Sequence, residues 1–490
     1  MKAFLPILVL AALAGCGGGS SPAADVPQPP PPPVPVDPPP APPPVEPPAP
    51  PQPAPGLDYY RNRCVAKPGA IPGTLQDEQN YLRLWIDATY LWYREVPTVD
   101  MSAYGSAVDY FNVLKTPVLT ASGRPKDRYH FSYPDEKWAE LSAGQQQGYG
   151  VTWVRRGDSR PRDWRVALVE AGSPADSAGL RRGDRLLEID SIDFINATGD
   201  AVDSLNRAIN PAPGTSHRFV LDRGGERIGA TLAAARVTVA PVQNTRVIDT
   251  ADGRVGYLTF GSHIAAAEAQ LIAAVTTLRD AGVTDLVLDM RYNGGGLLSI
   301  ASELAYMIAG PGATTGKTFE QTLPNDKSRQ SLPIPFIAKT LRGQVLPALN
   351  LKRVFVLAAP GTCSASESVI NSLRGIDVEV HLIGGTTCGK PYAFLPTSHC
   401  GTTYFAIQFQ GINAKGFGDY SDGFAPTCTV ADDLAHPVGS SGEALLATAL
   451  HYRTAGECPV PSAAARSAAR LPALVPVRPE AAEVTVHDLP

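Results

Sequence analysis

Residues 353–367 read RVFVLAAPGTCSASE, and their pattern indicates the fold class. It starts as a short apolar strand, turns at Pro360 and Gly361, and continues in small polar residues that open a helix. Strands that lead into helices are the repeating unit of α/β proteins. The same pattern predicts further strands at 254–260, 285–290, 378–384 and 404–410, and helices at 264–281, 298–309, 364–374 and 442–455. We therefore expect an α/β core over residues 240–457.

Ser364 stands where this strand turns into its helix. The N–H groups in the first turn of a helix favour developing negative charge, so a serine at this position could act as a nucleophile. The same residues also fit a capping box, because Glu367 follows Ser364 by three positions. A helix cap and a nucleophile both remain open on this segment alone.

Two more loops follow predicted strands and carry residues suited to chemistry. Asn293 is followed by three glycines, Gly294 to Gly296, whose backbone N–H groups could form an oxyanion hole or only a tight turn. Lys390 lies between Gly389 and Pro391 in a loop of small residues. A lysine that acts as a base must have its pKa lowered from about 10.4 by burial, and Ser–Lys pairs are a known nucleophile–base arrangement. An ordinary surface lysine is the alternative.

The two ends of the chain have a different composition. One lysine, an apolar run and a small-residue site precede Cys16, so residues 1–16 are expected to be a signal peptide. Leu13-Ala14-Gly15-Cys16 resembles the bacterial lipobox, which implies that Cys16 carries lipid. Residues 17–56 are rich in proline and are predicted to be an extended, disordered tether. Residues 458–490 are predicted to be a disordered tail.

Charge and cysteine content exclude some classes of function. The net charge of −5 without a basic block makes nucleic-acid binding a poor hypothesis. Apart from Cys16, six of the seven cysteines remain, which favours disulfides in an exported chain, with fifteen possible pairings. The spacing of cysteines and histidines does not match a zinc site, so no metal is expected.

Two regions precede the predicted core. Residues 57–140 show helical periodicity with an aromatic stripe that we expect to be buried, and they predict a helical N-terminal domain. Residues 145–239 contain a glycine turn before a strand and the segment Ala178-Gly179-Leu180-Arg181-Arg182-Gly183-Asp184. Both features resemble a PDZ domain. The resemblance implies that Tyr149, Gly150 and Val151 receive a peptide's terminal carboxylate while the peptide pairs with a sheet edge; a PDZ fold that serves only as a spacer is the alternative.

The three core loops, in this order after a PDZ domain, resemble those of the C-terminal processing peptidases over roughly residues 149–452. The resemblance implies a multidomain α/β protein with a crotonase-like peptidase core. It implies that Ser364 is the nucleophile, that Lys390 is its general base, and that the N–H groups of Ala365 and Gly295 hold the oxyanion. It also implies protein or peptide substrates and no cofactor.

The chain departs from the family pattern at several positions. The family's Asn-Pro-Gly-Gly turn is Asn293-Gly294-Gly295-Gly296, and the lysine is followed by Pro391 where the family has glycine. Phe394 replaces a glutamine that orients the lysine in many members. Cys363 and Cys388 flank the two predicted catalytic residues, and a bond between them or to Cys400 would fasten the loops together.

The sequence therefore predicts a serine endopeptidase that cleaves extended or unfolded envelope proteins. The chain is expected in the bacterial cell envelope, attached to the membrane by lipid alone, at the outer membrane and facing the periplasm or the surface. A non-catalytic peptide-binding protein is the alternative from another class. Within the enzyme hypothesis, a histidine could replace the lysine, and the candidates are His263, His381, His399 and His436.

Overall fold

The computed structural model describes residues 55–328, 333–461 and 471–477, which belong to one compact unit. The predicted signal peptide, Cys16 and the tether up to residue 54 lie outside the described residues. Among the described residues, no helix is both long and apolar enough to span a bilayer.

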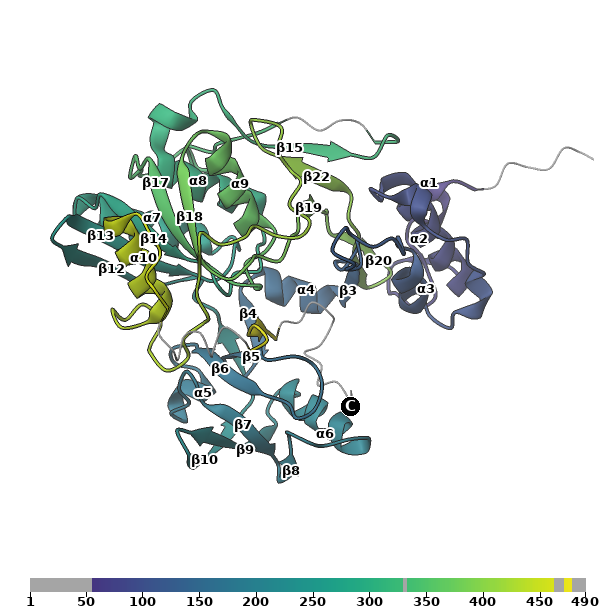
Figure 1. The fold of residues 1–490 in the computed structure, drawn as a ribbon. Coiled ribbons are helices and arrows are strands. Elements are labelled where there is room, and N and C mark those ends of the chain that lie inside the picture. Colours follow the sequence, from purple (N-terminus) through teal and green to yellow (C-terminus); the bar gives the residue numbers. More distant parts are fainter. Residues whose placement is uncertain (1–54, 329–332, 462–470, 478–490) are drawn as a thin grey trace, which may run out of the picture. The chain divides into compact units, whose positions relative to one another are not determined.

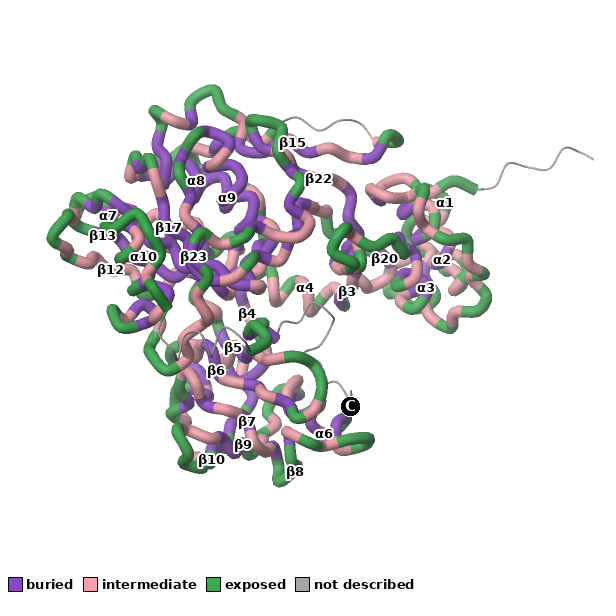
Figure 2. The backbone as a smooth tube through the Cα atoms, in the orientation of Figure 1, coloured by how far each residue is buried: buried purple, intermediate pink, exposed green. Residues whose placement is uncertain are grey.

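The core is built on a six-stranded sheet in the order β12-β13-β14-β17-β18-β23. β12 is antiparallel to β13, and the remaining neighbours are parallel. Side chains alternate between two faces, so that on β17 Val354 and Val356 pack with helices α7, α8 and α9, whereas Phe355 and Leu357 pack with α10. Figure 2 shows the central strands and α9 largely buried. The predicted α/β core is confirmed.

The described residues of the core region form sixteen helices and strands. They are β12 Val242–Thr250, β13 Gly253–Phe260, α7 Ala267–Asp280, β14 Asp285–Asp289, α8 Leu298–Thr314, β15 Thr318–Pro324, β16 Ile334–Pro335, β17 Arg353–Ala358, α9 Ala365–Gly375, β18 Glu379–Gly384, β19 Tyr392–Ala393, β20 Thr397–His399, β21 Thr402–Phe405, β22 Phe409–Ile412, β23 Cys428–Thr429 and α10 Ala444–Ala455 (Figure 1).

The predicted strand at 404–410 is wrong, because two strands occupy this region. β21 pairs with β20 and β3, whereas β22 pairs with β15 and β19. Between them, Ala406 and Ile407 are fully buried against the N-terminal aromatic cluster, and the Ile407 carbonyl accepts a hydrogen bond from the Leu91 N–H at 2.8 Å. This packing breaks the strand.

The PDZ region is a sheet in the order β10-β9-β7-β6-β5, flanked by α5 and α6. The glycine turn opens β5, and Ser173 caps α5 with Gly179 just beyond it, as predicted. The elements are β4 Gln145–Gly148, β5 Val151–Arg155, β6 Trp164–Val169, α5 Pro174–Ser177, β7 Arg185–Ile189, β8 Ile192–Asp193, α6 Asp200–Ile209, β9 Ser216–Arg223, β10 Glu226–Ala233 and β11 Ala235–Thr238.

The N-terminal region contains helices and short strands. Tyr81, Leu82 and Trp85 of α2 are buried, which confirms that the aromatic stripe is core. Its elements are α1 Leu57–Tyr60, β1 Arg63–Cys64, β2 Ile71–Pro72, α2 Leu75–Thr89, η1 Tyr93–Glu95, η2 Met101–Ala103, α3 Ala107–Val113, β3 Phe131–Pro134 and α4 Asp135–Ser142. β3 pairs with β21 of the core region.

Part of the C-terminal segment is ordered, which corrects the prediction of a disordered tail from residue 458. Cys458 is bonded to Cys428, and the other two disulfides join Cys64 to Cys400 and Cys363 to Cys388. Residues 471–477 include the strand β24, Val475–Pro476, which pairs with β5. The proline and alanine content that predicted disorder did not reveal this pairing.

Candidate functional site

The turn between β17 and α9 carries Ser364 in an unusual backbone conformation. Its φ is +56° and its ψ is −118°, a region that costs free energy for a residue with a side chain. Two hydrogen bonds hold the turn against the loop after β14: the Cys363 N–H donates to the Asn293 carbonyl at 3.0 Å, and the Thr362 hydroxyl donates to the Met290 carbonyl at 2.9 Å. The surrounding structure thus fixes Ser364 in this conformation at the start of a helix.

Gly295 lies directly against this turn. Its φ is +100°, and a Cβ at this position would come within 2.8 Å of the Ser364 Cβ and 2.9 Å of the Ala365 nitrogen. Only glycine fits so close an approach. Of the two predicted oxyanion donors, Ala365 is the first residue of α9, so its N–H has no acceptor within the helix. The Gly295 N–H, in contrast, donates to the Asn293 side-chain oxygen at 2.9 Å.

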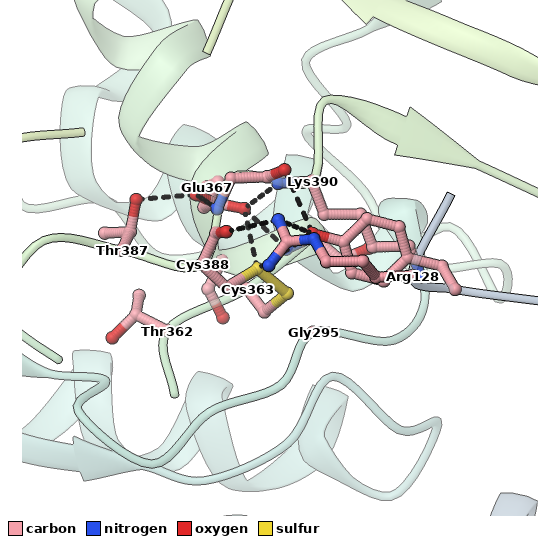
Figure 3. The surroundings of a disulfide bond; sticks show 12 residues. Arg128, Gly295, Thr362, Cys363, Glu367, Thr387, Cys388 and Lys390 are labelled. Atoms are coloured by element: carbon pink, nitrogen blue, oxygen red, sulfur yellow. Dashed lines mark hydrogen bonds between the residues drawn. A yellow bond between two sulfur atoms is a disulfide. The ribbon is translucent and has the colours of Figure 1, made fainter. Parts of the chain in front are cut away.

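Glu367 joins the Ser364 turn to the Lys390 loop. Its carboxylate is fully buried and accepts hydrogen bonds from the N–H groups of Gly389 and Lys390, both at 2.8 Å. It also accepts the Ser364 N–H at 3.1 Å and the Thr387 hydroxyl at 2.6 Å. Figure 3 shows the carboxylate between Thr387 and Lys390. Burial raises the pKa of Glu367, although these donors oppose the shift.

The helix-cap interpretation of Glu367 is therefore correct but incomplete. The sequence spacing reveals a helix cap, because a cap involves residues only three positions apart. The contacts to Gly389 and Lys390 join residues more than twenty positions apart, and no local pattern contains that information.

The Lys390 side chain is buried, with 8% of its surface exposed. Its Nζ lies 4.1 Å from the centre of the Phe394 ring and 4.8 Å from that of Tyr129. Ring faces attract an ammonium group, whereas burial disfavours it. Phe394, which replaces the family glutamine, therefore contacts the lysine directly but cannot hydrogen-bond to it.

The N-terminal region contributes to this loop, which the sequence did not reveal. The Tyr129 hydroxyl donates to the Gly389 carbonyl at 3.0 Å, and Arg128 donates to the Cys388 carbonyl at 3.1 Å. The Cys363–Cys388 disulfide crosses the same place, beside Ser364 and two residues before Lys390 (Figure 3). The N-terminal region and the turn that carries Cys363 and Ser364 therefore both hold the loop of the predicted base.

The side chains of His381, His399 and His436 contact residues outside the glycine turn. Of the four candidate histidines, the one at the glycine turn is His263. Its main-chain N–H donates to the Gly295 carbonyl at 3.0 Å, and its Nδ1–H donates to the Asn293 side-chain oxygen at 3.1 Å. The Nε2 atom is buried without a hydrogen-bond partner among the described residues. Burial lowers the pKa of His263 to about 4, so that the ring is neutral near pH 7.

A buried ion cluster supports the strand end that leads to Asn293. Arg291 is 1% exposed and donates to Asp289, Glu443 and Asp432 at 2.7–2.9 Å. Arg182, from the PDZ region, donates to the same Asp432 at 2.7 Å. Asp289 and Arg291 thus have a structural role, and through Asp432 they connect the core to the PDZ region.

The three predicted peptide-binding residues lie together at one end of the PDZ sheet. Gly150 has φ +76°, and a Cβ there would meet Ser173 at 2.3 Å. Tyr149 is buried, and its hydroxyl donates to the Ala208 carbonyl at 2.8 Å. Tyr149, Gly150 and Val151 line a pocket together with Lys137 of α4, whose positive charge suits a carboxylate.

Two groups of side chains have the composition of a metal site. One consists of Cys64, Glu78 and Cys400, and the other of Cys363, Glu367 and Cys388. In each group the two cysteines are joined in a disulfide, so their thiolates are not available as ligands.

The chain was compared with known proteins. The sequence profile of Peptidase family S41 matches residues 254–407, that of the PDZ domain matches 165–213, and that of the Peptidase S41 N-terminal domain matches 77–133. The carboxyl-terminal-processing protease of Picosynechococcus sp. is 28% identical over 46% of this chain and 50% of that protein. The protein of the same name from Synechocystis sp. is 29% identical over 45% and 48%. The chain thus spans about half the length of these curated relatives.

A solved structure shares the fold. The crystal structure of a protein described as an S41 protease from Bacteroides fragilis superposes with a TM-score of 0.62 at 22% identity, covering 80% of this chain and 99% of that one. The three profiles match the N-terminal region, the PDZ region and the core in the order found here. The chain therefore contains an S41 peptidase domain and a PDZ domain, and it is homologous to the carboxyl-terminal processing proteases.

Proposed function

We propose that the protein is a serine endopeptidase that cleaves extended or unfolded proteins, with Ser364 as nucleophile and Lys390 as general base. The observation that carries this proposal is the shared carboxylate of Glu367, which holds the Ser364 N–H and the Lys390 N–H on one oxygen. This link brings the main chains of the two predicted catalytic residues to the same place. The strained φ of Ser364 at a helix start supports the role of nucleophile.

The reaction would proceed in two steps. The Ser364 hydroxyl attacks the peptide carbonyl while the neutral Lys390 amine takes its proton, and the ammonium then returns the proton to the leaving amine. Water attacks the resulting acyl-serine in the second step, with the same lysine as base. The Ala365 N–H stabilises the oxyanion, and the Gly295 N–H joins it if it exchanges its bond to Asn293 for one to substrate.

Substrate selection would lie in the PDZ domain. A free C-terminal tail pairs with β5, and its carboxylate meets the N–H groups of the Tyr149–Val151 loop with Lys137 nearby. We also propose that Cys16 carries lipid and anchors the protein in the bacterial envelope, where unfolded exported proteins are available as substrates.

A second assignment of the base has a specific observation in its favour. His263 is neutral near pH 7, its Nδ1–H is held by Asn293, and its Nε2 lone pair has no partner among the described residues. A neutral imidazole oriented by a third group is one part of the nucleophile–base arrangement of other peptidases. The pH profile of kcat/KM tests this assignment: with His263 as the base, activity should persist down to about pH 5, and a loss of activity at a clearly higher pH would contradict it.

The test of the function is degradation of unfolded casein by the purified protein, compared with Ser364→Ala. We expect the wild type to cleave and the folded Ser364→Ala variant to be inactive. Equal cleavage by both proteins would exclude Ser364 as the nucleophile. A wild type that binds tail peptides but cleaves nothing would indicate the binding-protein alternative, which the Phe394 contact to Lys390 favours because it stabilises the ammonium.

A further inference from the structure

The edge strand of the PDZ sheet is already occupied by the chain's own C-terminal segment. β24 pairs antiparallel with β5, so that Val475 lies opposite Arg155 and Pro476 opposite Val154. The Val477 N–H continues the ladder and donates to the Trp153 carbonyl at 2.8 Å. Without this segment, β5 would be the last strand of the sheet and its backbone groups would be open to another chain.

Of residues 474–477, three are buried and only Val475 is exposed. Leu474 is 7% exposed and packs with Val154 and Ala167, whereas Val475 is 37% exposed. Val477 is 9% exposed and belongs to the hydrophobic core of the PDZ domain, with Tyr149. Val477 thus fills an apolar position beside the loop that we assign to the peptide terminus.

The direction of the segment is that of an incoming tail. Because the pairing is antiparallel, residue numbers rise along the segment while they fall along β5, toward the Tyr149–Val151 loop. A substrate tail whose terminal carboxylate meets this loop would run the same way along the same strand. The two cannot pair with β5 at the same time.

The segment also lies against the turn that carries the predicted nucleophile. A Cβ at Gly361, three residues before Ser364, would come within 2.5 Å of the Pro476 ring. Arg156 of the PDZ region donates to the Pro472 carbonyl at 2.8 Å and so fixes the start of the segment. Residues 472–477 therefore contact the peptide-binding strand and the Ser364 turn together.

We propose that Leu474–Val477 is an internal ligand of the PDZ domain, which holds the enzyme in an autoinhibited state until a substrate tail displaces it. The proposal rests on the peptide-binding role given to the PDZ domain above. The Cys428–Cys458 disulfide fastens the chain 16 residues before Leu474, so the segment binds intramolecularly. An attached ligand of this kind has an effective concentration on the order of millimolar. A free tail therefore displaces it only if the tail is more concentrated than this or binds more tightly.

The test measures binding, so that it does not depend on cleavage. A fluorescent peptide ending in Ala-Leu-Val-Pro-Val with a free carboxylate, the sequence of residues 473–477, is titrated into the full chain carrying Ser364→Ala. Val477→Asp places a charge in the apolar position and should tighten peptide binding by about tenfold or more. The matched control is Val460→Asp, the same change at an 89% exposed position before the segment, and its affinity should equal that of the parent.

A second measurement needs no substitution. Hydrogen exchange of the wild-type segment 471–477 should become faster when saturating peptide is added, because the Val477 N–H loses its bond to Trp153. Unchanged exchange in the segment, unchanged affinity in Val477→Asp, or absence of peptide binding to either protein would overturn the proposal. These outcomes are distinct from failure of the peptidase function, which the casein assay reports separately.

Discussion

At the scale of single residues, Glu367 explains most of the arrangement of the candidate site. One carboxylate receives three main-chain N–H groups and one hydroxyl from the two loops that carry Ser364 and Lys390. An isolated buried carboxylate would be costly, and these donors offset that cost. The strain at Ser364 is held in place by the same contacts.

Replacing Glu367 with glutamine should disturb both loops. The amide presents an NH₂ group to N–H donors, so at least one buried donor loses its acceptor, which costs about 1–3 kcal/mol of stability. We expect kcat to fall at least about tenfold, because a misplaced catalytic group is costly. The exposed Glu457→Gln is the matched control and should change neither quantity. Full activity with an unchanged melting temperature in Glu367→Gln would contradict this role.

Glu320 on β15 makes stability depend on pH. It is 2% exposed, and a Cβ on Gly411 would come within 2.5 Å of its carboxyl carbon. Burial raises its pKa to about 7 from an ordinary value of 4.5. The folded state thus binds this proton more tightly than the unfolded chain, so the free energy of unfolding falls as pH rises from about 4.5 to 7.

Glu320→Gln should remove this dependence. The variant should match the wild type near pH 4 and be more stable at pH 8, by up to about 3 kcal/mol. Denaturant unfolding at both pH values measures the difference. A difference that is the same at pH 4 and pH 8 would show that Glu320 does not titrate in this range.

At the scale of elements, the sequence predicted those features that depend on residues close together in the chain. The strand–turn–helix at Ser364 and the glycine turn at Gly295 follow from apolar runs and small residues, and the structure contains both. The split of the predicted strand 404–410 depends on burial of Ala406 and Ile407 against a distant cluster, which no local pattern encodes. For the same reason, the place of His263 beside Asn293 and the pairing of β24 with β5 were missed.

The disulfide between Cys363 and Cys388 should matter for catalysis and not only for stability. The loop that it closes has a sequence separation of 25, which predicts a loss of about 3 kcal/mol when both cysteines become alanine. Because the bond joins the Ser364 turn to the Lys390 loop, kcat should fall as well. The matched control is Cys428→Ala with Cys458→Ala, a separation of 30 outside these loops.

The control should lose similar stability and keep its kcat. Thermal unfolding and steady-state kinetics of the two double variants provide the comparison. If both variants keep the wild-type kcat at a temperature where both are folded, the Cys363–Cys388 bond only stabilises the fold.

At the scale of the whole molecule, the N-terminal and PDZ regions both contact the core that carries the candidate site. The N-terminal region supplies Arg128 and Tyr129 to the Lys390 loop, and the PDZ region reaches the core through Arg182 and Asp432. The C-terminal segment touches both the PDZ strand and the Ser364 turn. Peptide binding at the PDZ domain can therefore affect the candidate site through these contacts.

The proposed role of Lys390 as the base of Ser364 is tested most directly by kcat/KM on casein for Lys390→Ala beside His263→Ala. Both variants are first shown to be folded by their thermal unfolding. We expect Lys390→Ala to lose about 10²–10⁴-fold in kcat/KM, the usual contribution of a general base, and His263→Ala to keep most of its activity. Cleavage retained by Lys390→Ala and lost in His263→Ala would contradict the assignment and identify His263 as the base.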